Sequence, residues 1–433
     1  MSKKPTRMGI LCGGGPAPGM NSVISAATIE AINSGWEVYG IENGFEDLMR
    51  GSVERVRRLL IEDVSRIHLQ GGSVLYTSRA NPTKNPEDLA CTVATLKQIG
   101  LDVLMTVGGD DTGFSASVVA DSAQGSLGIV HVPKTIDNDL PLPHGVPTFG
   151  YESARHVGAN LITNLMTDAM TTRRWFFVVA MGRQAGHLAL GIGKSSGATI
   201  SVIAEDFPAG QPIGLDHVVD VLETSIFKRI AVGRPFGVAV LAEGLSLRFS
   251  DEDLMKATSV AESDEHGHVR LQEVHLHRIL ADRVKARFQK RGQTLTVVSK
   301  NIGYELRSAP PIPFDVDYTR DLGYGAVDYL RSLLAGKRGD EVGAMLSIQD
   351  GELIPLRFGS FNDPNTGRPR VRVVNVESES YRVAREYMIR LERKDLENPE
   401  ILAGIASAAQ MTPEEFKERY GYLVDVDTFQ PVY

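Results

Sequence analysis

Residues 8–33 read MGILCGGGPAPGMNSVISAATIEAIN and predict a strand, a turn and a helix in that order. The apolar run 8–12 has the length of a buried strand, and 21–33 has the composition of a helix. A glycine-rich turn between two such elements can present backbone N–H groups of Gly14 and Gly15 to a phosphate, helped by the helix dipole. One glycine cluster alone is more often only a tight strand-to-helix turn, so this interpretation needs further turns of the same kind.

Three later turns supply that support, because each also follows an apolar run. They read GGDDT at 108–112, PKTIDND at 133–139 and MGR at 181–183. In an open α/β sheet, ligands bind beyond the carboxyl ends of the strands. The acids and the lysine in these turns favour phosphoryl transfer over simple binding.

Composition limits the class of protein. The chain has 433 residues, 42% of them hydrophobic, which is enough for two or three packed domains. Its 54 acidic and 46 basic residues give a net charge of -8, which argues against a nucleic acid or an anionic membrane as partner. No apolar run has the length of a membrane helix. The two cysteines, Cys12 and Cys91, form neither a disulfide framework nor a Cys-rich metal site, and they predict a reducing, cytoplasmic location.

The pattern of strands and helices predicts an α/β fold with two facing Rossmann-like domains, mostly parallel sheets and an active site in the cleft between them. Further strands are predicted at 36–41, 101–107 and 127–132, and the pattern restarts after Gly150 with a helix at 155–172. The predicted strands of the second domain are 175–180, 199–204, 236–241 and 294–302. The expected domains are 1–155, 156–307 and a C-terminal segment, 308–433, made of a helical return and an extension.

The C-terminal segment is harder to assign. It carries a predicted helix at about 321–334, strand-like pieces at 344–348 and 370–376, and a charged helix at about 380–396. Before it, the charge run 251–268 is expected to be a surface loop or helix.

Acidic residues in the turns are the first candidates for catalysis. Two glycines before Asp110 allow a sharp turn that points this carboxylate into the site, where it can hold Mg²⁺ directly or through water. The alternative for Asp110 is a helix N-cap, a role that Thr112 could fill instead. Asp137 and Asp139 flank Asn138, so one acid can take a proton from a hydroxyl while the other positions metal or water. The alternative here is an Asx-type turn, and the nearby Lys134 weighs against it.

Arginines are the candidate phosphate clamps, because the planar guanidinium fits phosphate oxygens. The candidates are Arg79, Arg174, Arg183 and Arg307. Each alone is more often a surface ion pair, but Arg183 and Arg307 each close an apolar strand. Glu243 also follows a strand and could accept hydrogen bonds from sugar hydroxyls. The histidines show no metal-binding spacing.

Together these motifs resemble the phosphofructokinase family over about 8–334. The resemblance implies a Mg²⁺-dependent enzyme that phosphorylates the 1-hydroxyl of fructose 6-phosphate, with a donor-binding first domain and a sugar-phosphate-binding second domain. By position it makes Asp137 the proton acceptor and Asp110 the magnesium residue. The implied donor contacts are Gly14, Gly15 and Arg79. The implied sugar-phosphate contacts are Thr135, Ile136, Asp137, Met181, Gly182, Arg183, Glu243, Tyr304, Glu305, Leu306 and Arg307. Arg174 falls where the family supplies an arginine from a neighbouring subunit, which implies a homodimer or homotetramer.

Departures from the family pattern bear on the phosphoryl donor. ATP-using members carry glycine where this chain has Asp111 and Lys134, and the pair resembles the pyrophosphate-dependent branch. These side chains would occupy the space of ATP's α-phosphate, Asp111 would repel a third anion, and Lys134 would stabilise the leaving phosphate. Pro16 replaces an aspartate common in the bacterial ATP enzymes. Val298 stands where a second cross-subunit arginine is expected, and Lys300 could substitute for it.

The resemblance therefore implies reversible transfer from pyrophosphate to fructose 6-phosphate, catalysed by Asp137, Lys134 and Asp111 and running in both glycolytic and gluconeogenic directions. The alternatives are an ATP-dependent phosphofructokinase, a silent regulatory subunit, and a lipid or nicotinamide-nucleotide kinase with a similar Gly-Gly-Asp turn. Sedoheptulose 7-phosphate is an alternative acceptor.

Overall fold

The chain forms two compact units, each built from two separate stretches of sequence. The computed structural model describes residues 4–250, 252–253, 275–339, 341–360 and 370–425. Unit 1 combines Met1–Ala154 with Tyr304–Arg372, and unit 2 combines Arg155–Gly303 with Val373–Tyr433. The predicted charge run 251–268 lies outside the described residues except for Glu252 and Asp253.

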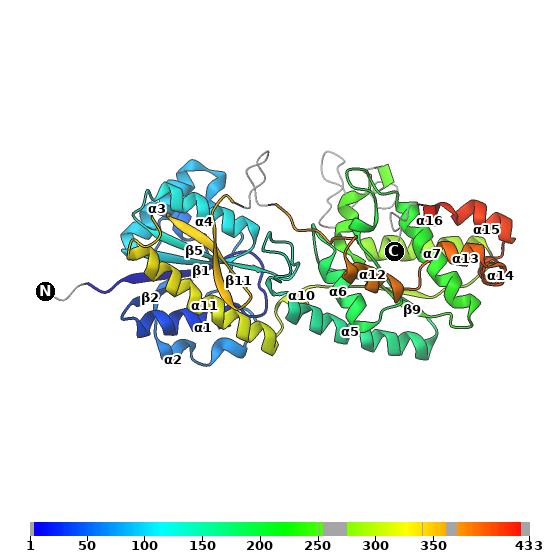
Figure 1. Ribbon diagram of the computed structural model, residues 1–433, viewed down its shortest axis with the longest axis horizontal. Helices are drawn as coiled ribbons and strands as arrows, with labels where there is room; N and C mark the ends of the chain where they lie inside the picture. The colour runs from blue at the N-terminus through cyan, green and yellow to red at the C-terminus, as the bar shows by residue number, and fades with distance from the viewer. Residues whose placement is uncertain (1–3, 251, 254–274, 340, 361–369, 426–433) are drawn as a thin grey trace. The chain divides into compact units, whose positions relative to one another are not determined.

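Unit 1 is built on an eight-stranded sheet (Figure 1). Its main path runs β12-β11-β5-β4-β1-β2-β3, and β6 pairs with β5. The pairs β2–β3 and β11–β12 are antiparallel and the others are parallel. The strands are β1 (Arg7–Cys12), β2 (Glu37–Ile41), β3 (Val56–Leu59), β4 (Val103–Gly108), β5 (Gly128–Thr135), β6 (Phe149–Gly150), β11 (Gly343–Gln349) and β12 (Glu352–Arg357).

Helices cover both faces of this sheet, which explains why its central strands are apolar throughout. Met8 and Ile10 of β1 belong to the core shared with helices α1 and α11, whereas Leu11 points into the core on the other face, under α3 and α4. Figure 1 shows α1 beside α11, with α3 and α4 across the strands from them. The helices are α1 (Met20–Asn33), α2 (Ile61–Val64), α3 (Pro86–Ile99), α4 (Asp110–Ser122), α10 (Tyr304–Arg307) and α11 (Pro313–Leu334).

Unit 2 has a four-stranded parallel sheet in the order β10-β7-β9-β8. The strands are β7 (Trp175–Ala180), β8 (Ile200–Val202), β9 (Gly237–Ala242) and β10 (Val297–Ile302). The longer helices are α5 (Tyr151–Thr172), which begins in unit 1, α6 (His187–Ser196), α7 (Leu215–Ala231) and α9 (Leu276–Lys290). The C-terminal helices are α12 (Glu379–Glu386), α13 (Arg393–Glu397), α14 (Pro399–Ala408), α15 (Pro413–Tyr420) and α16 (Tyr422–Asp425).

Buried ion pairs attach the C-terminal helices to unit 2. Asp220 and Glu223 of α7 are both buried, and both accept hydrogen bonds from Arg287 of α9. Arg291 also pairs with Glu223, and Arg419 of α15 pairs with Asp220. Breaking one partner of such a network leaves a buried charge uncompensated, so these contacts hold α7, α9 and α15 together.

The C-terminal stretch differs from its prediction. Residues 308–433 divide between the two units: β11 pairs with β5 in unit 1, and the chain from Val373 onward belongs to unit 2. Helix α11 begins at Pro313 rather than near 321, since proline is well suited to the first turn of a helix.

Three local predictions were also wrong. Residues 370–376 form no strand. The helix predicted at 380–396 is two helices, α12 and α13, separated where the Ile389 N–H donates to Thr199 O instead of to its own helix. Residues 199–204 give only the three-residue β8, followed by a 3₁₀ turn at Ala204–Asp206.

Candidate active site

The glycine turn after β1 is fixed by two neighbouring segments. Gly13 N–H donates to Val107 O of β4 at 2.9 Å, and Gly14 N–H donates to Ser78 O at 2.8 Å. Gly14 has φ 77°, a left-handed conformation that favours glycine. Gly14 therefore gives the turn its shape, and its N–H is used by Ser78 rather than offered to a phosphate as predicted. Arg79 follows Ser78 directly and is exposed beside the turn.

Two cations meet this turn at Gly15. Lys134 Nζ, at the end of β5, donates to Gly15 O at 2.6 Å. Arg307 approaches from α10: a Cβ added to Gly15 would lie 2.9 Å from its Nη1. The guanidinium of Arg307 also lies 4.5 Å from the ring centre of Tyr304. The structure thus brings Arg307 to the predicted donor side within unit 1, although the family resemblance assigns it to the sugar phosphate.

Lys134 is a buried cation surrounded by acids. It is 5% exposed, and burial lowers its pKa to about 8, opposed by the negative charges of Asp137, Asp139 and Asp110. Since these charges act on Lys134, the turns 108–112 and 133–139 lie close together around the lysine. A buried ammonium with a lowered pKa is well suited to an anionic ligand, because the ligand's negative charge would raise that pKa and keep the ammonium charged.

Asp110 and Asp111 begin helix α4, and both are exposed. The helix N-cap is Gly109, which makes no side-chain cap bond, so the alternative role of Asp110 as N-cap does not hold. The pKa of Asp139 is raised by burial and by the charge of Asp110, so these carboxylates lie close to each other.

The Asp137–Asn138–Asp139 turn is shaped by its neutral residues. Thr135 Oγ1 accepts from Asp137 N–H at 3.0 Å. Asn138 has φ 56°, and its Oδ1 accepts from Thr148 N–H at 3.0 Å. Asparagine tolerates this left-handed conformation better than most residues. The turn is thus built around Asn138, with one carboxylate on each side.

These acids fit a magnesium ion. Within the described ranges, no group of three or more His, Cys, Asp or Glu side chains forms a cation cage. Magnesium usually takes only one or two carboxylates and completes its octahedron with water and phosphate oxygens. The negative charge of Asp110 helps to raise the pKa of Asp139, and a bound cation would relieve this effect.

Unit 2 gathers a second set of predicted residues at the carboxyl ends of three strands. Met181–Gly182–Arg183 follows β7, Glu243 follows β9, and Gly303 follows β10. Glu243 Oε2 accepts from Gly182 N–H at 3.2 Å, and a Cβ on Gly303 would lie 2.7 Å from Met181 Cε. Gly182 has φ 143°, which favours glycine. Met181, Gly182, Arg183 and Glu243 therefore form one local cluster.

Other predicted residues are not part of these clusters. Arg174 precedes β7, whereas Met181 follows it, so the full length of a six-residue strand separates them. Ile136 and Leu306 are 5% and 0% exposed, so their side chains pack in the interior. Their substrate contacts stay predictions. Tyr304 and Glu305 are exposed on α10, in unit 1.

Two residues that the sequence did not reveal hold these loops. Arg372 donates to Asn138 O at 3.0 Å. Glu205 Oε1 accepts from Gly186 N–H at 2.9 Å, just after the Met-Gly-Arg turn, and from Val374 N–H at 3.0 Å. Arg372 lies 234 residues from Asn138 in sequence, and no local pattern signals such a contact.

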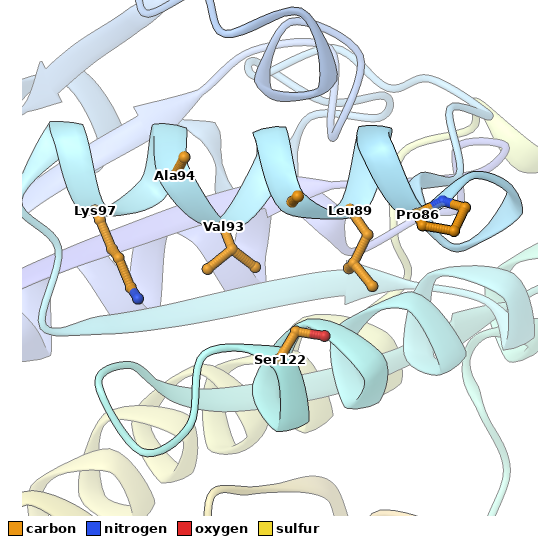
Figure 2. Close-up of a pocket in the computed structure, with 7 residues that line it drawn as sticks. Pro86, Leu89, Val93, Ala94, Lys97 and Ser122 are labelled. Carbon is orange, nitrogen blue, oxygen red and sulfur yellow. The ribbon is translucent and has the colours of Figure 1, made fainter.

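The groove drawn in Figure 2 is a separate feature of unit 1. It has a volume of about 400 Å³ and lies between α3 and the C-terminal end of α4. Its lining comprises Pro86, Leu89, Ala90, Val93, Ala94, Lys97 and Ser122. Because Asp110 begins α4 and Ser122 ends it, the groove lies at the other end of this helix from the acidic turn.

Two α/β units with polar, glycine-containing turns at the carboxyl ends of their strands define a phosphate-handling enzyme of the open-sheet type. The sequence matches the family described as "Phosphofructokinase" over residues 7–330, and the chain belongs to this family.

Named relatives extend over nearly the whole chain. It is 54% identical to "Pyrophosphate--fructose 6-phosphate 1-phosphotransferase" of Thermotoga maritima, covering 97% of this chain and 99% of that protein. It is 48% identical to the protein of the same name from Naegleria fowleri, covering 98% and 97%. Among solved structures, Pichia pastoris phosphofructokinase in the T-state matches with a TM-score of 0.64 at 20% identity. That match covers 97% of this chain but 39% of the Pichia chain, and it shows likeness of fold alone.

Proposed function

We propose that this protein transfers a phosphoryl group reversibly from pyrophosphate to the 1-hydroxyl of D-fructose 6-phosphate. The products are fructose 1,6-bisphosphate and phosphate. The main observation behind this proposal is the buried Lys134 ammonium, which lies between the glycine turn and the acids of two other turns. The names of the two relatives at 54% and 48% identity support the same reaction.

The donor proposal rests on Lys134 and Asp111. Lys134 Nζ bonds to Gly15 O, and a Cβ on Gly14 would lie 3.6 Å from the same nitrogen, so the ammonium fills the space beside this turn. A short donor with two phosphates leaves that space to the lysine, whereas a nucleotide needs room for a third phosphate. The exposed carboxylate of Asp111 adds repulsion against an extra anionic group.

The chemistry follows from the acidic turn. The sugar's 1-hydroxyl oxygen forms the new bond to phosphorus while the bond to the departing phosphate breaks, and Asp137 accepts the hydroxyl proton. Lys134 stabilises the negative charge on the transferring and departing groups. Asp110 would hold Mg²⁺, which supplies charge neutralisation on the phosphates when it is bound.

In unit 2, sugar-phosphate binding is proposed for Met181, Gly182, Arg183 and Glu243. In unit 1, the same role is proposed for Thr135, Tyr304, Glu305 and Arg307. Arg174 is proposed to serve a second copy of the chain, in a homodimer or homotetramer. Its separation from Met181 by the length of β7 supports this role, because it cannot join the cluster of its own unit.

The test is the initial rate of fructose 1,6-bisphosphate formation with Mg²⁺, comparing pyrophosphate with ATP at equal concentrations. We expect a rate at least about a hundredfold higher with pyrophosphate, which corresponds to about 2.7 kcal/mol of discrimination. The double variant Asp111→Gly/Lys134→Gly should lose most of this preference, and Lys97→Gly, on the distant groove, serves as a control. A wild-type preference for ATP would refute pyrophosphate as the donor. A phosphorylation rate with sedoheptulose 7-phosphate equal to or higher than that with fructose 6-phosphate would change the proposed acceptor to the seven-carbon sugar phosphate.

A further inference from the structure

Arg372 binds the acidic turn 137–139, although it lies far from this turn in the sequence. Its Nε donates to Asn138 O at 3.0 Å, its Nη2 donates to Asn138 Oδ1, and its Nη1 donates to Val146 O at 2.6 Å. Its backbone N–H donates to Asp139 O at 2.7 Å. One residue therefore makes four hydrogen bonds to the turn and to the loop that follows it.

The planar guanidinium suits this task. Three acceptors at fixed angles are satisfied by one rigid group, which the flexible ammonium of a lysine cannot do. Asn138 is the residue with the left-handed backbone, and Asp137 and Asp139 are bonded to it on either side. A change in the backbone of Asn138 would therefore redirect both carboxylates.

Arg372 also contributes charge. Its side chain is half-buried; burial lowers its pKa, and the nearby carboxylate of Asp139 acts in the opposite direction. The acidic turn thus has two cations, Lys134 and Arg372, and only Lys134 contacts the glycine turn.

We propose that Arg372 is a positioning residue that holds Asp137 in the orientation needed to accept the sugar proton. The inference rests on the proposed function, because it takes Asp137 as the proton acceptor. It adds a residue from the C-terminal stretch to the machinery of phosphoryl transfer.

The experiment compares Arg372→Ala and Arg372→Lys with wild type, measuring kcat and the KM of both substrates. Arg370→Ala is the matched control, because Arg370 is an exposed arginine two residues away whose guanidinium bonds to Ser360 O. Asp137→Asn gives the rate that remains without the proton acceptor. We expect kcat to fall about a hundredfold in Arg372→Ala and about tenfold in Arg372→Lys, with each KM within about threefold of wild type.

Two readouts separate positioning from a loss of folding. Guanidinium chloride at a non-denaturing concentration should restore part of the kcat of Arg372→Ala, whereas sodium chloride at the same ionic strength should not. Asn138→Gly keeps the left-handed backbone and removes one acceptor of Arg372. In the double variant with Arg372→Ala, kcat should therefore fall by less than the product of the two single fold-changes in kcat.

A wild-type kcat in Arg372→Lys overturns the proposal, even if Arg372→Ala does not fold. Absence of guanidinium rescue in folded Arg372→Ala, or fully independent effects of the two substitutions, also overturns it. Every comparison uses whichever of pyrophosphate and ATP gives the higher wild-type rate. A preference for ATP would then refute the proposed donor and leave the test of Arg372 intact.

Discussion

At the scale of single residues, the site depends on one lysine whose burial works against its own charge. Lys134 is buried, yet its Nζ meets Gly15 O and its pKa remains near 8 because three acids offset the burial. A bound pyrophosphate would add negative charge beside the ammonium and would further favour its charged form.

The pKa of Lys134 predicts a pH dependence of donor binding. Because the pKa is lowered from 10.5 to about 8, the side chain is charged below pH 8 and becomes neutral as the pH rises through this value. The KM for pyrophosphate should therefore rise above about pH 8. In Lys134→Met the KM should already be raised, by tenfold or more, at pH 7.

The measurement is the KM for pyrophosphate from pH 6.5 to 9.5 for both proteins in the same buffers. In Lys134→Met, any change of KM with pH comes from the titration of pyrophosphate itself, and this change is subtracted from the wild-type pH profile. Identical pH profiles for the two proteins would contradict the assignment.

At the scale of elements, hydrogen bonds join the starts of helices α5 and α11. Asp315, in the first turn of α11, accepts hydrogen bonds from Gly150 N–H and Ser153 N–H, both at 2.8 Å, and from Ser153 Oγ. Ser153 Oγ in turn accepts from Ile312 N–H at 2.9 Å. The start of α11 and the start of α5 are thus tied together within unit 1, close after the strand that carries Lys134.

Replacing Asp315 should therefore destabilise the fold. Asp315→Ala leaves buried backbone donors at Gly150 and Ser153 without a partner, which we expect to cost about 2–4 kcal/mol of unfolding free energy. Asp317→Ala is the control, because Asp317 lies two residues further along the same helix and is exposed. Thermal unfolding of the two variants tests this, and equal melting temperatures would contradict the role of Asp315.

The same scale shows what could be predicted from the sequence. Buried parallel strands such as β7 are continuous apolar runs, and the structure confirms β7 residue for residue. Helices whose ends are set by distant partners were placed less well. Helix α12 ends at Glu386, and Ile389, three residues further on, donates to Thr199 O instead of continuing the helix. The bond from Arg372 to Asn138 joins segments with no sequence pattern in common. Leu306 lies within a recognised motif, but the motif could not reveal that its side chain faces the interior.

At the scale of the whole molecule, the proposed assembly rests on Arg174. This arginine precedes β7, so it cannot reach the cluster that follows the same strand. None of the helices in the described part of the chain is long and apolar enough to span a membrane. We propose that Arg174 serves a second copy of the chain, and a symmetric dimer would exchange two such residues.

Mixing two inactive proteins tests this exchange. Asp137→Asn and Arg174→Ala should each lose most activity as separate proteins. If Arg174 serves the neighbouring subunit, hybrid dimers contain one intact site, and random mixing should restore about a quarter of wild-type activity. The measurement is kcat after joint unfolding and refolding of equal amounts of the two variants, with each variant refolded alone as control. Activity no higher than the sum of the controls would place Arg174 outside a shared site.

The path of the chain between the units has a consequence for inheritance. The chain changes unit between Ala154 and Arg155, between Gly303 and Tyr304, and between Arg372 and Val373. No single cut in the gene separates the two units, because each needs a piece encoded beyond the other. One crossover between Ala154 and Tyr304 would combine β1–β6 of one parent with β11 and β12 of the other in the sheet of unit 1. We therefore expect the residues proposed for the donor and those proposed for the sugar phosphate to descend together, as one inherited set.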